Sequence, residues 1–198
     1  MNNMNKYTER QIEIIEAATE RIDRFGIQNF TIKNLAGDIG LSEPALYRHF
    51  GGKNEILVGL LDYFSAEMKN RLSNIISTGN NSVSDELRAI FKSQLKTFSE
   101  KPAIVSVIFA EGIFHFNEEL SGKVSEIMKM MSDVVKSNIK KGQDAGEYAG
   151  LINSSTLATI IIGGMRMTVL KWKLTGHKSN LVKDGSAIVE GVLKMIEK

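Results

Sequence analysis

Residues 31–53, TIKNLAGDIGLSEPALYRHFGGK, restrict the fold of this chain more than any other stretch. Apolar residues recur at three- and four-residue spacing in its first half, which predicts a short helix with one buried face, and Gly40 follows as its stop. Ser42 can cap a second helix, with Glu43 and Pro44 in the first turn. Two short helices joined by so tight a turn indicate a helix-turn-helix, whose second helix can enter the major groove of DNA.

The second helix carries a more specific pattern than the turn before it. Residues 41–50, LSEPALYRHF, with Lys53 after them and Phe30 and Thr31 before, resemble the signature of the TetR (tetracycline-repressor-like) family. The signature lies within the first third of the chain, and the remainder is similar only in length and helical character. The resemblance implies a DNA-reading domain fused to a helical domain that binds a ligand and forms a homodimer. Repression is the family's usual mode of action.

The resemblance and the chemistry of the DNA grooves together predict ten DNA-binding residues. Glu43 can accept a hydrogen bond from a cytosine amino group, while Pro44 and Ala45 can touch a thymine methyl. Tyr47 and His49 are similar to the family's phosphate contacts, although both could also be ordinary half-buried surface residues. The full predicted set is Thr31, Lys33, Ser42, Glu43, Pro44, Ala45, Tyr47, Arg48, His49 and Lys53.

The charge balance constrains how such a domain could bind DNA. The whole chain has a formal net charge of only +2, and residues 1–53 hold seven Lys and Arg against seven Asp and Glu. Phosphate neutralisation normally supplies much of the affinity for DNA. We therefore expect the cations to gather on one edge, with the acids mainly on the first helix and facing away.

The rest of the chain is predicted to be helical. The first helix begins with a Thr8–Gln11 capping box, buries a stripe that ends at Phe25, and stops at Gly26. A helix that ends at Lys140-Lys141-Gly142 is expected to bury Met128. The expected helices cover about 8–25, 32–39, 43–50, 53–76, 87–98, 102–109, 117–141, 153–174 and 184–197, with a loop at 77–84.

The fold class is therefore predicted to be all-α, with about nine helices and no sheet. An N-terminal three-helix DNA-binding domain is expected over residues 8–68, with its helix-turn-helix at 31–50. A helical effector-binding and dimerisation domain is expected over residues 69–198.

The apolar stretch 157–170 favours a dimer. It is too short to span a membrane, and the pair Gly163-Gly164 suggests close backbone contact with another helix. The final helix has apolar residues at the same seam spacing. Two helices from each of two subunits would form a four-helix interface, as the family implies, although both helices could instead serve a purely intramolecular core.

A small apolar or aromatic effector fits the second domain better than a sugar or a metal. The chain has eight methionines besides Met1, and methionine adapts to irregular ligands. His115 and His177 are isolated, so we predict no metal and no cofactor. The candidate ligand-binding residues, each of which could also be plain core, are Phe91, Phe109, Phe114, Met128, Met131, Met165 and Trp172.

The sequence lacks the residues and motifs that several classes of protein need for their function. The absence of cysteine excludes disulfides, thiol catalysis and cysteine zinc sites, and no HExxH, phosphate loop or GxSxG motif indicates an enzyme. The polar start does not resemble a signal peptide, so we expect a cytoplasmic protein. The predicted function is a ligand-responsive transcriptional repressor that binds a palindromic operator as a dimer. The alternative is a DNA-binding architectural or protein-interaction module without an effector.

Overall fold

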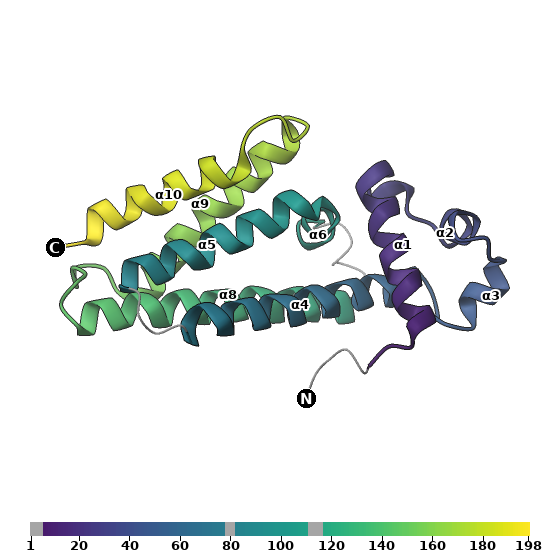
Figure 1. Cartoon of the computed structure of the whole chain (residues 1–198), viewed down its shortest axis with the longest axis horizontal. Helices are drawn as coiled ribbons and strands as arrows, with labels where there is room; N and C mark the ends of the chain where they lie inside the picture. Colours follow the sequence, from purple (N-terminus) through teal and green to yellow (C-terminus); the bar gives the residue numbers. More distant parts are fainter. Residues whose placement is uncertain (1–5, 78–81, 111–116) are drawn as a thin grey trace. The chain divides into compact units, whose positions relative to one another are not determined.

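The computed structural model describes residues 6–77, 82–110 and 117–198, and across these ranges the chain is helical (Figure 1). They contain nine α-helices, one 3-10 helix and no strand, apart from an isolated bridge between Tyr148 and Glu197. The predicted fold class is thus confirmed. The described helices include none that is long and apolar enough to cross a membrane.

The chain divides into two compact units. Unit 1 comprises residues 1–67 and 101–127, and unit 2 comprises residues 68–100 and 128–198. Helices α4 and α8 contribute residues to both units. The boundary between a DNA-binding domain at residues 8–68 and an effector-binding domain at residues 69–198 stays a prediction.

Unit 1 contains the N-terminal helices and the first parts of the two shared helices. Its elements are α1 (Glu9–Phe25), η2 (Ile27–Asn29), α2 (Ile32–Asp38), α3 (Glu43–Tyr47), the start of α4 (Lys53–Ser77), α6 (Pro102–Ile108) and the start of α8 (Glu118–Asp144).

Unit 2 contains the remaining parts of α4 and α8 together with three further helices. These are α5 (Val83–Glu100), α9 (Ser154–Leu174) and α10 (Leu181–Ile196). Leu87, Ile90 and Leu95 of α5 are fully buried, as are Val169 of α9 and Leu193 of α10, so every one of these helices contributes to the core.

Most helix ends follow the sequence signals. The Thr8–Gln11 capping box is present, and Gly26 follows α1 with φ +77°. The predicted end of α8 at Gly142 is wrong, because the helix continues to Asp144. The ring of Tyr148 occupies the space that a side chain at position 142 would need. Gly142 therefore allows the ring to pack closely against the helix and does not end it.

Two residues predicted to be buried are exposed. Phe25 is 47% exposed, and its ring lies beneath the guanidinium groups of Arg21 and Arg24, 4.9 and 5.2 Å from the ring centroid. Met128 is 51% exposed because it lies beside the buried stripe of α8 that runs through Ile127 and Met131. Both predictions treated a flanking apolar residue as part of the buried stripe.

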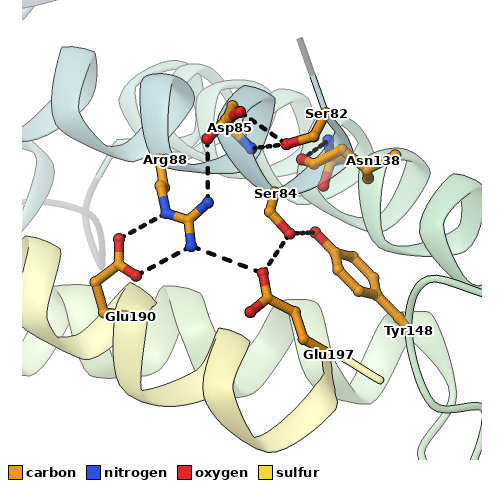
Figure 2. Close-up of polar contacts among 9 residues, drawn as sticks. Ser82, Ser84, Asp85, Arg88, Asn138, Tyr148, Glu190 and Glu197 are labelled. Atoms are coloured by element: carbon orange, nitrogen blue, oxygen red, sulfur yellow. Dashed lines mark hydrogen bonds and ion pairs between the residues drawn. The ribbon is translucent and has the colours of Figure 1, made fainter.

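A polar network fastens α5 to the end of α10 within unit 2 (Figure 2). Arg88 donates two hydrogen bonds to the Glu190 carboxylate, at 2.7 and 3.1 Å. Ser84 donates to Glu197 at 2.6 Å and contacts the buried Tyr148 hydroxyl at 3.0 Å. Because the Arg88 contact is bidentate, it fixes the rotation of α10 about its axis as well as its distance from α5.

The two adjacent glycines of α9 have different surroundings. A Cβ atom at Gly164 would lie 2.7 Å from Ile188 of α10 in the same chain, whereas a Cβ atom at the exposed Gly163 would meet nothing within 4 Å. The close contact predicted from this pair is therefore intramolecular at Gly164, and only Gly163 is open to another molecule.

We expect Gly185→Ala to destabilise the protein. A Cβ atom there would lie 2.5 Å from Cδ1 and 2.7 Å from Cδ2 of Leu95, a fully buried side chain. Overpacking of this kind costs about 1–3 kcal/mol, which exceeds the gain of about 1 kcal/mol from helix propensity. Urea unfolding should show a lower midpoint with the same slope.

Gly122→Ala is the matched control, because it makes the same change in a helix where a Cβ atom meets nothing within 4 Å. This variant should gain about 0.5–1 kcal/mol. Equal shifts of the same sign in both variants would contradict the packing argument.

Candidate nucleic-acid interface

Helices α2 and α3 form the predicted helix-turn-helix, and local side chains fix both helix starts. Thr31 caps α2 by accepting a hydrogen bond from the Asn34 amide, and Ser42 caps α3 by accepting one from the Ala45 amide. Gly40 lies between them with φ +66°, a backbone conformation that glycine adopts without strain. The turn between the helices is therefore determined by three residues.

The first turn of α3 presents a short polar surface. Ser42, Glu43 and Pro44 are exposed, as is Lys33 on α2. Ala45 is only 9% exposed, so of the residues predicted to read bases it has the least surface to offer.

The end of α3 carries the residues predicted to contact phosphate. Tyr47 is 51% exposed and Arg48 is also exposed, while His49 is half-buried. The His49 carbonyl accepts a hydrogen bond of 2.9 Å from Nε2 of Gln11, which ties the end of α3 to the start of α1. An exposed phenol hydroxyl and an exposed guanidinium group can both donate hydrogen bonds to phosphate oxygens.

Lys53 begins α4 and is only partly available to solvent. Its ammonium group donates a long hydrogen bond of 3.5 Å to the Ile27 carbonyl and lies 5.5 Å from the centroid of the Phe30 ring. Burial lowers the pKa of the Lys53 ammonium below its usual range. The side chain therefore supports the turn after α1, and only part of its charge faces outward.

Ion pairs neutralise part of the acidic charge in this region. Arg21, whose side chain is 12% exposed, pairs with Asp38 at 2.5 Å and joins α1 to α2. Arg10 pairs with Glu13 on α1. Each pair uses one cation together with one acid, so the net charge of this region stays balanced.

Sequence reasoning missed one group of residues in unit 1. Asp62 of α4 is 5% exposed, and its carboxylate accepts hydrogen bonds from Lys6 at 2.6 Å and from the Tyr7 hydroxyl at 2.8 Å. Lys123 of α8 lies 3.0 Å from the other carboxylate oxygen. We call Lys6, Tyr7, Asp62 and Lys123 the Asp62 cluster.

The contacts within the Asp62 cluster shift the pKa values of Asp62 and Tyr7. Burial raises the pKa of Asp62, but hydrogen bonds from Lys6, Lys123 and Tyr7 outweigh it and lower that pKa below its usual value. Burial and the adjacent carboxylate raise the pKa of Tyr7, so its hydroxyl stays a donor. The one available sequence signal was the single acid within the apolar run ILVGLLDYF.

The predicted ligand-binding residues differ in their burial and in the unit to which they belong. Phe91, Met131, Met165 and Trp172 are buried in unit 2, and each is no more than 7% exposed. Met128 is exposed on α8, Phe109 is half-buried in unit 1, and Phe114 lies outside the described residues. The ligand-binding role of all seven residues stays a prediction, and four of them belong to the buried core of unit 2.

The His177 side chain of unit 2 packs against a neighbouring aromatic ring. His177 lies at φ +63° after α9, and its ring stacks on Trp172 with the centroids 4.1 Å apart. His115 lies outside the described residues. Within the described ranges, no three His, Asp or Glu side chains gather in a way that could hold a metal ion.

Two family models together match nearly the whole chain. Residues 14–60 match the model described as "Bacterial regulatory proteins, tetR family", and residues 61–195 match the one described as "YsiA-like protein, C-terminal region". A curated relative, the nucleoid occlusion factor SlmA of Idiomarina loihiensis, is 25% identical over 154 residues, which are 77% of this chain and 78% of the relative.

Solved structures share the fold at lower identity. The fatty acid degradation regulator FadR from Bacillus halodurans has a TM-score of 0.78 at 19% identity, covering 94% of this chain and 95% of its own. The transcriptional regulator FadR from Bacillus subtilis, solved with stearoyl-CoA, has a TM-score of 0.74 at 20% identity and covers 92% and 97%. All three proteins are named for regulation or nucleoid occlusion, and none is named for catalysis.

Proposed function

The chain belongs to the TetR family of bacterial regulatory proteins and is a DNA-binding regulator, and we propose that it is a ligand-responsive repressor of transcription. In this proposal it binds a palindromic operator as a dimer and leaves it when a small apolar effector binds. The observation that carries the proposal is the capped α2–α3 turn, which presents Glu43, Tyr47 and Arg48 on one exposed stretch.

The proposed division of roles follows the exposure of each residue. Glu43 and Pro44 are exposed at the start of α3, the part of a recognition helix that reaches base edges. Tyr47, Arg48 and Lys53 follow at its end and at the start of α4, where contacts to phosphate would fix the register without reading sequence.

We expect Lys53→Ala and Tyr47→Phe to weaken binding to all duplexes alike, by about threefold to tenfold, because each removes a phosphate contact. Glu43→Gln should instead alter which sequences are preferred, because an amide also donates hydrogen bonds. Duplexes selected from a random pool by the wild-type protein provide the panel, and fluorescence anisotropy gives each affinity.

The salt dependence separates the two classes further. Lys53→Ala should reduce the slope of log affinity against log salt by about one, and Glu43→Gln should leave it unchanged. If all three variants shifted sequence preference equally, the division of roles would be wrong. A wild-type protein without affinity for any duplex at low ionic strength would end the whole proposal.

An exposed apolar stripe on α9 supports the dimer. Its members recur at three- and four-residue spacing on the outer face of the helix, and α10 continues it with Ile188 and Met195, 37% and 73% exposed. One glycine lies exposed in each helix, which permits close approach of a second copy. The α9 members are Ile160, Gly163, Met167, Leu170 and Leu174.

Self-association explains why this surface would be apolar. A C2 interface places the same patch against itself, so a single stripe buries two copies of every residue. A palindromic operator has the matching symmetry, with half-sites one helical turn apart, about 34–36 Å.

We expect Met167→Glu to shift the protein from dimer to monomer. Met167 is 65% exposed in the middle of the stripe, so the dimer would have to bury an unpaired carboxylate twice. Sedimentation velocity at micromolar concentration gives the mass. Met128→Glu is the control, since Met128 is 51% exposed but lies on α8 and off the stripe. A wild-type monomer, or equal loss of dimer in both variants, would contradict the interface.

An acyl-CoA is the effector class that we propose. The support is the similarity to FadR, whose Bacillus subtilis structure holds stearoyl-CoA, together with the buried apolar set of unit 2. One polar atom there also lacks a hydrogen-bond partner among the described residues. This atom is Oδ1 of Asn138, a side chain only 2% exposed, and a donor on a ligand could satisfy it. To release DNA, the ligand must bind the state with the wrong half-site spacing more tightly.

Stearoyl-CoA should raise the melting temperature, change the emission of Trp172 and weaken binding to the selected duplex about tenfold or more. Trp172 is the only tryptophan in the sequence and is 4% exposed in unit 2, so its fluorescence reports on that core. Coenzyme A alone is the control and should leave all three measurements unchanged. Stabilisation without any loss of DNA affinity would contradict effector control.

A second candidate is an architectural DNA-binding protein without a small-molecule effector. The observation that favours it is the curated relative named as a nucleoid occlusion factor, at 25% identity. The stearoyl-CoA titration separates the candidates, because an architectural protein should bind the duplex equally with and without the acyl-CoA.

A further inference from the structure

Three separate segments of unit 1 meet at one buried carboxylate. Lys6 and Tyr7 come from the stretch before α1, Asp62 from α4, and Lys123 from α8. The Asp62 side chain is 6% exposed, whereas those of Lys6 and Lys123 are 53% and 28% exposed. The carboxylate is therefore fixed, and the two lysines are the groups that can leave it for water.

Because Asp62 is buried, its carboxylate depends on its hydrogen-bond and ion-pair partners. A carboxylate this deep needs its partners, because an unpaired buried charge is far more costly than an unpaired surface charge. If Lys123 moved away, Asp62 would have to draw its remaining donors, Lys6 and Tyr7, into new positions. The position of α8 is thus linked to the position of the chain before α1.

Tyr7 connects the carboxylate to the helix-turn-helix. Its ring centroid lies 6.3 Å from that of Phe50, the residue that closes the turn after α3. It also lies beside Gly59 of α4, where a Cβ atom would come within 3.6 Å of Cζ of Tyr7. The ring is therefore packed between α4 and the end of the recognition segment, residues 43–50.

A second contact on the same side strengthens this connection. Gln11 holds the His49 carbonyl at 2.9 Å, so the first turn of α1 is fixed to the end of the recognition segment. Tyr7 directly precedes Thr8, the cap of that turn. A displacement of Tyr7 would therefore be transmitted to residues 43–50 through Phe50 and through the start of α1.

We propose that the Asp62 cluster couples helix α8 to the recognition segment, so that the contact between Lys123 and Asp62 sets the position of residues 43–50. This inference rests on the proposed DNA-binding function. Lys6, Tyr7, Asp62 and Lys123 are positioning residues, which act on DNA affinity through the recognition segment without touching DNA.

Helix α8 is suited to carry the signal. Lys123 belongs to unit 1, and the same continuous helix reaches Met131, a buried residue of unit 2 in the candidate ligand set. A displacement of Lys123 from Asp62 is the change in α8 that the proposal requires.

The experiment compares Lys123→Met with Lys101→Met in the full-length protein. Lys101 forms the matched pair, because it also binds an acid of α4 within unit 1, at 2.8 Å from Glu67, but has no contact with Tyr7. Amide hydrogen exchange of residues 43–50 and affinity for the selected duplex are measured for both variants, alongside the melting temperature.

We expect Lys123→Met to speed exchange in residues 43–50 and to weaken duplex binding, each by about threefold or more, while Lys101→Met leaves both within about twofold of wild type. Tyr7→Phe should reproduce the effect, since it keeps the ring and removes only the donor to Asp62. Lys123→Arg should restore wild-type behaviour by keeping the charge. Tyr7→Phe also keeps the test decisive if Lys123→Met does not fold.

Equal amide exchange in residues 43–50 and equal DNA affinity in Lys123→Met and Lys101→Met would overturn the proposal. The cluster would then contribute to stability alone. Loss of affinity that tracks the melting temperature across all variants would overturn it as well. If the wild-type protein bound no duplex, the proposed function would fail, whereas the exchange comparison would still decide whether α8 controls residues 43–50.

Discussion

Residues 56–62 of helix α4 are buried on every side, and the architecture of unit 1 depends on this. All seven residues from Ile56 to Asp62 are buried, so this helix needs a neighbour on each of its faces. Gly59 allows α1 to approach closely, since a Cβ atom there would lie 2.7 Å from Ile15. Asp62 can occupy the same buried surface only because three donors surround it. Packing and charge pairing thus fix the same helix.

Features that are satisfied within a few residues could be predicted from the sequence. The caps at Thr8, Thr31 and Ser42 each bond an amide three residues further on, and Gly40 supplies a local backbone conformation. The helix-turn-helix, the family and the helical fold class follow from such signals. The end of α8 did not, because the role of Gly142 depends on Tyr148, a residue outside the helix.

Features that depend on distant residues could not be predicted. Asp62 and Lys123 are far apart in the sequence, and nothing in either local pattern indicates that they meet. The burial of Met128 was misjudged because periodicity gives the direction of an apolar stripe but not its width. In the same way, two adjacent glycines look alike in sequence, while Ile188 covers only Gly164.

The pairing of α5 with α10 has a consequence for biosynthesis. Arg88 and Glu190, like Leu95 and Gly185, are brought together from opposite ends of unit 2. While the ribosome is still making the intervening residues, α5 lacks α10, and the apolar side chains that α10 will cover remain open to chaperones. Unit 2 can close only after residue 196 has emerged from the exit tunnel, whereas α1, α2 and α3 are free to associate much earlier.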